Sequence, residues 1–184
     1  MMRLFVGLDL PDDILSGLAE TIRRLRPAAP GLRWSPVENL HITTKFIGSW
    51  PDERLDELKA ALAGIQCKPF EVQISGMGWF PNPHSPRILW AAVRGGDALA
   101  GLAEATDLAT DSVGVARETK PYAPHLTLAR VDQGIDLRSL RGAVAGLSNT
   151  DWGRFRADSF CLYRSQTGPA GSVYTKLAGF PFSV

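Results

Sequence analysis

The feature that most constrains the fold of this chain is a short pattern that occurs twice: a histidine, an aliphatic residue and a threonine. The first copy is His41-Ile42-Thr43 and the second is His125-Leu126-Thr127, 84 residues apart in a chain of 184. The chain contains three histidines, so two of the three stand in this pattern. Each copy opens a run of apolar and β-branched residues that is typical of a strand. Any fold for this chain therefore has to place two similar strands that lie close to half the chain length apart.

Helical and strand-like segments alternate irregularly around the two copies. The segment that starts at Pro11 is predicted to be a helix, because apolar residues recur every three or four positions from Ile14 to Leu25. Further helices are predicted over 51–63, after Gly95-Gly96 and over 136–145. This order favours an α+β fold, with antiparallel strands backed by helices, over a doubly wound parallel sheet. Strand-like runs occupy 2–10, 40–47, 70–77, 87–94, 124–130, 155–163 and 172–179.

The composition is that of an ordinary globular protein, and no linker divides it, so residues 1–184 are expected to form a single domain. The formal net charge is +1. A balance this close to neutral argues against wrapping a long nucleic acid through a broad basic stripe, and leaves a short or terminal nucleic acid open. The apolar runs are far shorter than the roughly 20 residues that cross a bilayer, and the first ten residues are not typical of a signal peptide. We expect a cytoplasmic monomer that does not contact a membrane, with Cys67 and Cys161 as reduced thiols.

The residue types in the repeated pattern suit chemistry at a phosphate group. Residues i and i+2 of a strand point to the same face, so each histidine lies beside the threonine of its own copy while the aliphatic residue between them faces the core. An imidazole with a pKa near 6.5 can take or give a proton at neutral pH, and a hydroxyl can donate to a phosphate oxygen. Displacement at phosphorus runs in line, so the general base and the general acid have to flank the phosphate. His41 and His125 can do so because they lie on separate strands.

Together with other segments, the two copies resemble the two-histidine (2H) phosphoesterase superfamily, and within it the RNA 2′,3′-cyclic phosphodiesterases first named 2′-5′ RNA ligases. The segments that carry the resemblance are Arg3–Leu8, Leu40–Gly48, Pro121–Arg130, Leu162–Ser165 and Gly171–Tyr174. They span nearly the whole chain. The resemblance implies a bilobal α+β fold of two pseudo-symmetric lobes, each an antiparallel sheet with helices outside, and a central cleft lined by His41, Thr43, His125 and Thr127.

The reaction that the resemblance implies is metal-free hydrolysis of a terminal 2′,3′-cyclic phosphate on RNA or a small nucleotide, which leaves a 2′-phosphate. The resemblance implies no cofactor. His125 is assigned as the base that activates water, and His41 as the acid that protonates the departing 3′ oxygen. Thr43 and Thr127 are assigned to the non-bridging phosphate oxygens. Arg130 matches the basic residue that follows the second copy in the family, and is assigned to substrate binding.

Strand alternation makes separate predictions for residues near the two copies. Arg130 would fall on the face opposite the histidine of its copy, so a role at the phosphate requires a bulge or the strand end. Lys45 shares the parity of the first histidine and is expected to be a solvated lysine at the rim of the cleft. Phe46 has the opposite parity and is expected to pack in the core. Whether Phe5 or Tyr122 contacts substrate is left open.

Three alternative interpretations assign a different function to the same residues. A metallohydrolase with His41 and His125 as ligands would need a third protein ligand, and no acidic residue or histidine stands at a ligand spacing from either. A non-catalytic protein that binds RNA ends in the same cleft would need the same hydroxyls and charges. The same chemistry could act on a small cyclic phosphodiester, or run backward to join RNA ends without ATP, since the chain has no P-loop.

Overall fold

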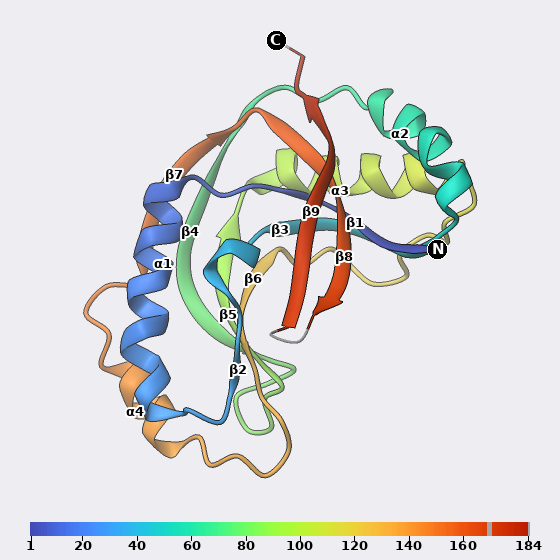
Figure 1. Ribbon diagram of the computed structural model, residues 1–184. Coiled ribbons are helices and arrows are strands. Elements are labelled where there is room, and N and C mark those ends of the chain that lie inside the picture. Colours follow the sequence, from blue (N-terminus) through green and yellow to red (C-terminus); the bar gives the residue numbers. More distant parts are fainter. Residues whose placement is uncertain (169–170, 184) are drawn as a thin grey trace.

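The computed structural model describes residues 1–168 and 171–183, which contain two sheets and four α-helices (Figure 1). Within these residues, no helix is long and apolar enough to cross a bilayer. The helices are α1 (Asp12–Leu25), α2 (Leu55–Ala63), α3 (Gly96–Asp111) and α4 (Arg138–Ala145). The strands are β1 (Met2–Leu8), β2 (Arg33–Trp34), β3 (Ile42–Trp50), β4 (Phe70–Phe80), β5 (Ile88–Arg94), β6 (His125–Arg130), β7 (Asp151–Ala157), β8 (Ser159–Gly168) and β9 (Gly171–Pro181).

Each copy of the repeated pattern lies in a different sheet. The four-stranded sheet has the order β3-β1-β8-β9, and the five-stranded sheet has the order β2-β6-β5-β4-β7. All neighbouring strands pair antiparallel. His41 immediately precedes β3, and His125 begins β6. The predicted α+β fold of two lobes, each built on an antiparallel sheet, is confirmed.

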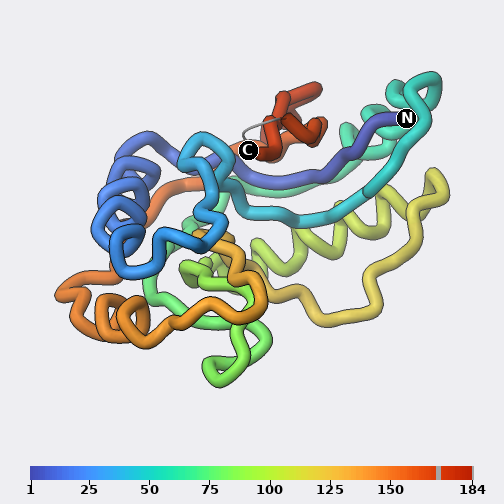
Figure 2. Tube along the Cα trace, turned by 60° about the horizontal axis from the view of Figure 1, so that its bottom comes forward, coloured from blue at the N-terminus to red at the C-terminus, as the bar shows by residue number. Residues whose placement is uncertain are grey.

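The helices pack on the faces of the sheets that carry the aliphatic residues. The four residues Ile14, Leu18, Ile22 and Leu25 form the buried stripe of α1, which the helical periodicity predicted. Figure 2 shows α1 with α4 at one side of the molecule and α2 with α3 at the other. The aliphatic faces of both sheets join one continuous cluster of buried residues. The opposite face of each sheet carries the histidine and threonine of one copy.

Two details of the sheets differ from the prediction. The run over 155–163, predicted as one strand, contains the end of β7 and the start of β8, which belong to different sheets. Asp158 lies between them, and its carbonyl oxygen accepts the backbone N–H of Phe182 at 2.7 Å. The buried positions change parity here, from Ala157 to Phe160, as the chain passes from one sheet to the other. The strand β2 has two residues, too few for any alternation, so no sequence pattern predicts it.

Candidate active site

Both copies of the repeated pattern place their histidine and threonine on one face of a strand. Ile42 and Leu126 are 0% exposed, while the histidine and threonine on either side of each are partly buried. The alternation predicted from the sequence is therefore present in both sheets. It turns one imidazole and one hydroxyl of each copy away from the core.

Each strand also carries a bulge directly after the threonine, and the two bulges match. In β3 the register with β1 passes from Thr43 to Lys45, and in β6 the register with β5 passes from Thr127 to Ala129. Each strand thus contains one residue more than its partner at this point. Two consecutive residues are buried as a result, and the next residue is exposed on the face of the histidine.

The bulges decide where three further residues lie. Arg130 returns to the face of His125 and is exposed, which meets the condition that its assigned role requires. Phe46 occupies the matching place in β3 and is 66% exposed, so the prediction that it packs in the core is wrong. Lys45 is 2% exposed, so the prediction of a solvated lysine at the rim of the cleft is also wrong. Both errors have one cause, because simple alternation takes no account of the extra residue.

The two imidazoles are oriented by equivalent backbone contacts. His41 Nδ1 lies 2.7 Å from the carbonyl oxygen of Asn39, and His125 Nδ1 lies 2.8 Å from the carbonyl oxygen of Ala123. A carbonyl oxygen can only accept, so Nδ1 carries a hydrogen in both rings. The Nε2 atom of each ring is then the one left to exchange a proton with a ligand. In both copies the accepting residue stands two positions before the histidine.

Aromatic rings pack against each imidazole. The ring of Phe5 stacks on His41 with 4.4 Å between centroids, and Tyr174 meets the same imidazole edge-on at 5.1 Å. Phe80 meets His125 edge-on at 5.2 Å. Burial in this setting lowers the pKa of His41, against smaller opposing effects of its backbone hydrogen bond and a nearby carboxylate. Phe5 is therefore a packing partner of the histidine and not a free surface.

The nearby carboxylate belongs to Asp9, which follows β1. The hydroxyl of Tyr163 and the ammonium of Lys176 both donate to it. Burial works to raise the pKa of Asp9, but these hydrogen bonds lower it below its ordinary value. The carboxylate is consequently ionised at neutral pH and supplies a negative charge on the His41 side of the molecule.

Comparison with known proteins gives the family. Residues 8–90 match the family described as LigT like phosphoesterase. The RNA 2′,3′-cyclic phosphodiesterase of Methanothermobacter thermautotrophicus is 30% identical over 183 residues, which cover 97% of this chain and 98% of that protein. The RNA 2′,3′-cyclic phosphodiesterase of Thermus thermophilus is 33% identical over 190 residues, which cover 97% of this chain and 89% of that protein. The chain belongs to the LigT-like phosphoesterase family.

The fold of this LigT-like phosphoesterase is similar to that of solved structures. The crystal structure of TT0787 of Thermus thermophilus aligns with a TM-score of 0.83 at 28% identity and covers 98% of both chains. The crystal structure of E. coli LigT complexed with 3′-AMP aligns with a TM-score of 0.81 at 22% identity, over 100% of this chain and 99% of that one. At 22% identity the second likeness supports the fold alone.

In this phosphoesterase, Lys45 connects the first motif strand to the segment that leads to His125. Its ammonium lies 2.6 Å from a carboxylate oxygen of Asp107 in α3 and 2.7 Å from the carbonyl oxygen of Ala116. Arg117 binds the other oxygen of that carboxylate at 2.5 Å. Burial works to raise the pKa of Asp107, but the hydrogen bonds from Lys45 and Arg117 lower it below its ordinary value.

A second contact joins the two motifs of the phosphoesterase more directly. The hydroxyl of Tyr122 donates to the carbonyl oxygen of Thr43 at 2.9 Å. Burial raises the pKa of Tyr122 above its ordinary value, so the hydroxyl keeps its proton. Tyr122 stands three residues before His125, so this bond holds the start of the second motif against the first.

Several neighbours of the two imidazoles were not predicted from the sequence. Asp9, Phe80 and Tyr174 are far from either histidine along the chain, and only the pairing of strands brings them close. Within residues 1–168 and 171–183, no three His, Cys, Asp or Glu side chains are grouped so that they could hold a metal ion.

Proposed function

We propose that this phosphoesterase hydrolyses the terminal 2′,3′-cyclic phosphate of RNA and leaves a 2′-phosphate. The single observation that carries the proposal is the matched pair of imidazoles, one in each sheet, each with Nδ1 held by a backbone carbonyl and Nε2 left for proton transfer. The substrate class is supported by relatives named RNA 2′,3′-cyclic phosphodiesterase that are 30% and 33% identical over nearly the full chain.

In the proposed reaction, His125 acts as general base and His41 as general acid. His125 Nε2 takes a proton from water as the water oxygen bonds to phosphorus. The bond from phosphorus to the 3′ oxygen breaks on the opposite side, and His41 Nε2 gives that oxygen its proton. Each proton transfer contributes about 10²–10⁴-fold to the rate. Neither transfer requires a metal ion. If the 5′ hydroxyl of a second RNA took the place of water, the same two transfers would join the RNA ends through a 2′-5′ linkage without ATP.

The lowered pKa of His41 bears on this assignment. A general acid has to be protonated before the reaction, and burial disfavours the protonated form. An anionic phosphate bound beside the imidazole favours the protonated form, so substrate binding itself charges the proposed acid. The exchanged assignment, with His41 as base, is the second candidate, because a lowered pKa suits a base.

The remaining assigned residues bind the phosphate in this proposal. The hydroxyls of Thr43 and Thr127 donate to the two non-bridging oxygens, whose charge grows in the transition state. After the bulge, Arg130 lies on the same face of β6 as Thr127 and supplies a positive charge at the C-terminal end of that strand. A guanidinium suits this position because its N–H groups form charge-assisted hydrogen bonds with phosphate.

A short RNA that ends in a 2′,3′-cyclic phosphate tests the proposal, incubated with the protein in excess chelator. We expect one product that carries a 2′-phosphate, identified by its phosphorus NMR shift, and little product from His41→Ala or His125→Ala. Arg23→Ala, on the exposed face of α1, is the control and keeps full activity. Binding of the RNA without turnover would instead support the RNA-end binder, and loss of activity in chelator that one added metal restores would contradict the metal-free mechanism.

A further inference from the structure

A basic pocket lies at the end of the strand that carries the second motif. Its volume is about 930 Å³, and its walls are the loop before β5, the loop after β6 and one face of α4. The lining contains two aspartates and five arginines, so its net charge is +3 in a chain whose total is +1. The arginines are Arg33, Arg87, Arg130, Arg138 and Arg141.

Two of these arginines are neutralised within the protein and three are not. Arg33 pairs with Asp132 at 2.6 Å, and Arg138 pairs with Asp136 at 2.7 Å. Arg87, Arg130 and Arg141 form no ion pair with any residue in 1–168 or 171–183. The pocket thus presents three uncompensated guanidinium groups to whatever fills it.

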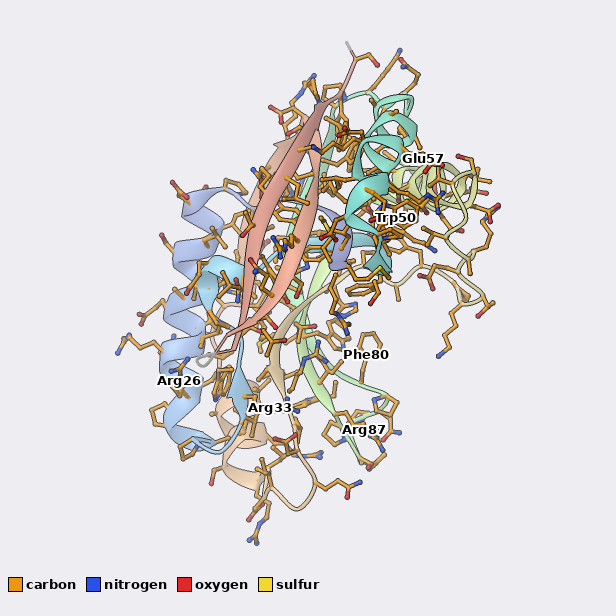
Figure 3. The ribbon with its side chains drawn as sticks, turned by 45° about the vertical axis from the view of Figure 1, so that its right-hand side comes forward. Arg26, Arg33, Trp50, Glu57, Phe80 and Arg87 are labelled. Atoms are coloured by element: carbon orange, nitrogen blue, oxygen red, sulfur yellow. The ribbon has the colours of Figure 1, made fainter. Side chains whose placement is uncertain are left out.

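The pocket lies at the end of the sheet and reaches from the histidine face, where Arg130 lies, to the face covered by α4, where Arg141 lies. Thr127 lies opposite Trp90, and Arg130, next on the same face, lies opposite Ile88 and Arg33. Three residues of strand span roughly 10 Å, so the pocket begins one step beyond the phosphate-binding threonine. Figure 3 shows Arg33 on β2 and Arg87 before β5 at the same end of the molecule.

The backbone fixes the place of Arg87 in this pocket. Its N–H donates to the carbonyl oxygen of Phe80 at 2.6 Å, and its own carbonyl oxygen accepts the N–H of Val131 at 2.9 Å. Arg141 is held from α4, with its guanidinium over the ring of Trp79 at 5.7 Å. Both side chains therefore project from anchored positions, and both lie outside the four motif residues.

We propose that this pocket binds the phosphate backbone of the RNA strand on the 5′ side of the cyclic phosphate. The proposal rests on the proposed function, since it names where the rest of that substrate lies. Arginine forks suit phosphate oxygens. No Phe, Tyr or Trp is among the lining residues, and His84 is the one aromatic side chain there, so arginine contacts to phosphate predominate and little base preference is expected. It also explains how a chain of charge +1 can engage RNA, because the positive charge is concentrated at one place.

The test compares a five-nucleotide RNA ending in a 2′,3′-cyclic phosphate with adenosine 2′,3′-cyclic phosphate. For Arg87→Ala/Arg141→Ala, we expect the KM for the RNA to rise roughly tenfold, as the loss of two partly exposed phosphate contacts predicts. KM and kcat for the mononucleotide stay within about twofold of the wild type, because that substrate does not reach the pocket. In wild-type protein the RNA KM rises with salt, and the slope of log KM against log salt falls by about 0.7 for each arginine removed.

The control variant is Lys59→Ala/Lys68→Ala, which removes the same charge at the end of the molecule that carries α2. It leaves the KM for RNA unchanged if the pocket and not net charge binds the strand. Equal KM for RNA in wild-type protein and in the arginine variant would overturn the proposal, as would an equal loss with both substrates. If neither substrate is turned over, the proposed function fails. Fluorescence anisotropy with the labelled RNA then tests whether the pocket binds RNA. Weaker binding by the arginine variant alone supports the proposal, and unchanged binding refutes it.

Discussion

The two imidazoles occupy different surroundings although their sequence patterns match. His41 lies between the rings of Phe5 and Tyr174, and burial there lowers its pKa. Among residues 1–168 and 171–183, His125 has one aromatic neighbour, Phe80, which ends β4 just before the first loop of the pocket. At the scale of the residue, this asymmetry would allow two identical side chains to take the opposite roles proposed for them. The pattern alone could not reveal it, because the neighbours come from other strands.

Substitution of the two threonines tests the role proposed for their hydroxyls. Thr43→Val and Thr127→Val remove a hydroxyl at nearly constant volume, and each should lower kcat about 10²–10³-fold if the hydroxyl stabilises the transition state. Thr→Ser at either position keeps the donor and should be much milder. Steady-state kinetics with the cyclic-phosphate RNA gives the result, and thermal unfolding shows whether the fold is intact. A valine variant with wild-type turnover would refute the assigned role.

At the scale of the element, the matched bulges in β3 and β6 mark the limit of sequence-based prediction. Alternation correctly placed the histidines, the threonines and the buried residue between them, because these precede the bulge. Alternation failed for Lys45 and Phe46, which follow the bulge. It would also have failed for Arg130 if the need for a bulge there had not been recognised. The alternating pattern of a strand sequence does not show where a bulge adds a residue, because both copies continue with ordinary strand residues.

The buried ion cluster gives a prediction at the same scale. Lys45→Met leaves the buried carboxylate of Asp107 with Arg117 as its remaining charged partner, and removal of one member of a buried pair destabilises a protein by about 3–5 kcal/mol. We expect a loss of about 3 kcal/mol in urea unfolding, because Arg117 remains. Lys45→Met/Asp107→Leu should recover part of that loss. Arg138→Ala breaks an exposed pair and should leave the midpoint unchanged; an equally small effect of Lys45→Met would show that the cluster does not support the fold.

At the scale of the whole molecule, the topology brings two sheets together so that their motif strands meet. The bond from Tyr122 to Thr43 and the contacts of Lys45 with Ala116 and Asp107 join the first motif strand to the approach of the second. The α+β class and the presence of two lobes could be predicted from the order of the segments and the family resemblance. The change of sheet at Asp158 and the basic pocket could not, because both depend on which strands become neighbours.

In the proposed mechanism the two lobes divide the proton transfers, with the base on one sheet and the acid on the other. The most direct measurement compares His41→Ala and His125→Ala on two substrates, the cyclic-phosphate RNA and an analogue with a nitrophenolate in place of the 3′ oxygen. A nitrophenolate leaves without a proton, so it bypasses a general acid but not a general base. We predict that the analogue restores turnover to His41→Ala and not to His125→Ala. Rescue of His125→Ala, with His41→Ala still inactive, would contradict the assignment and exchange the two roles.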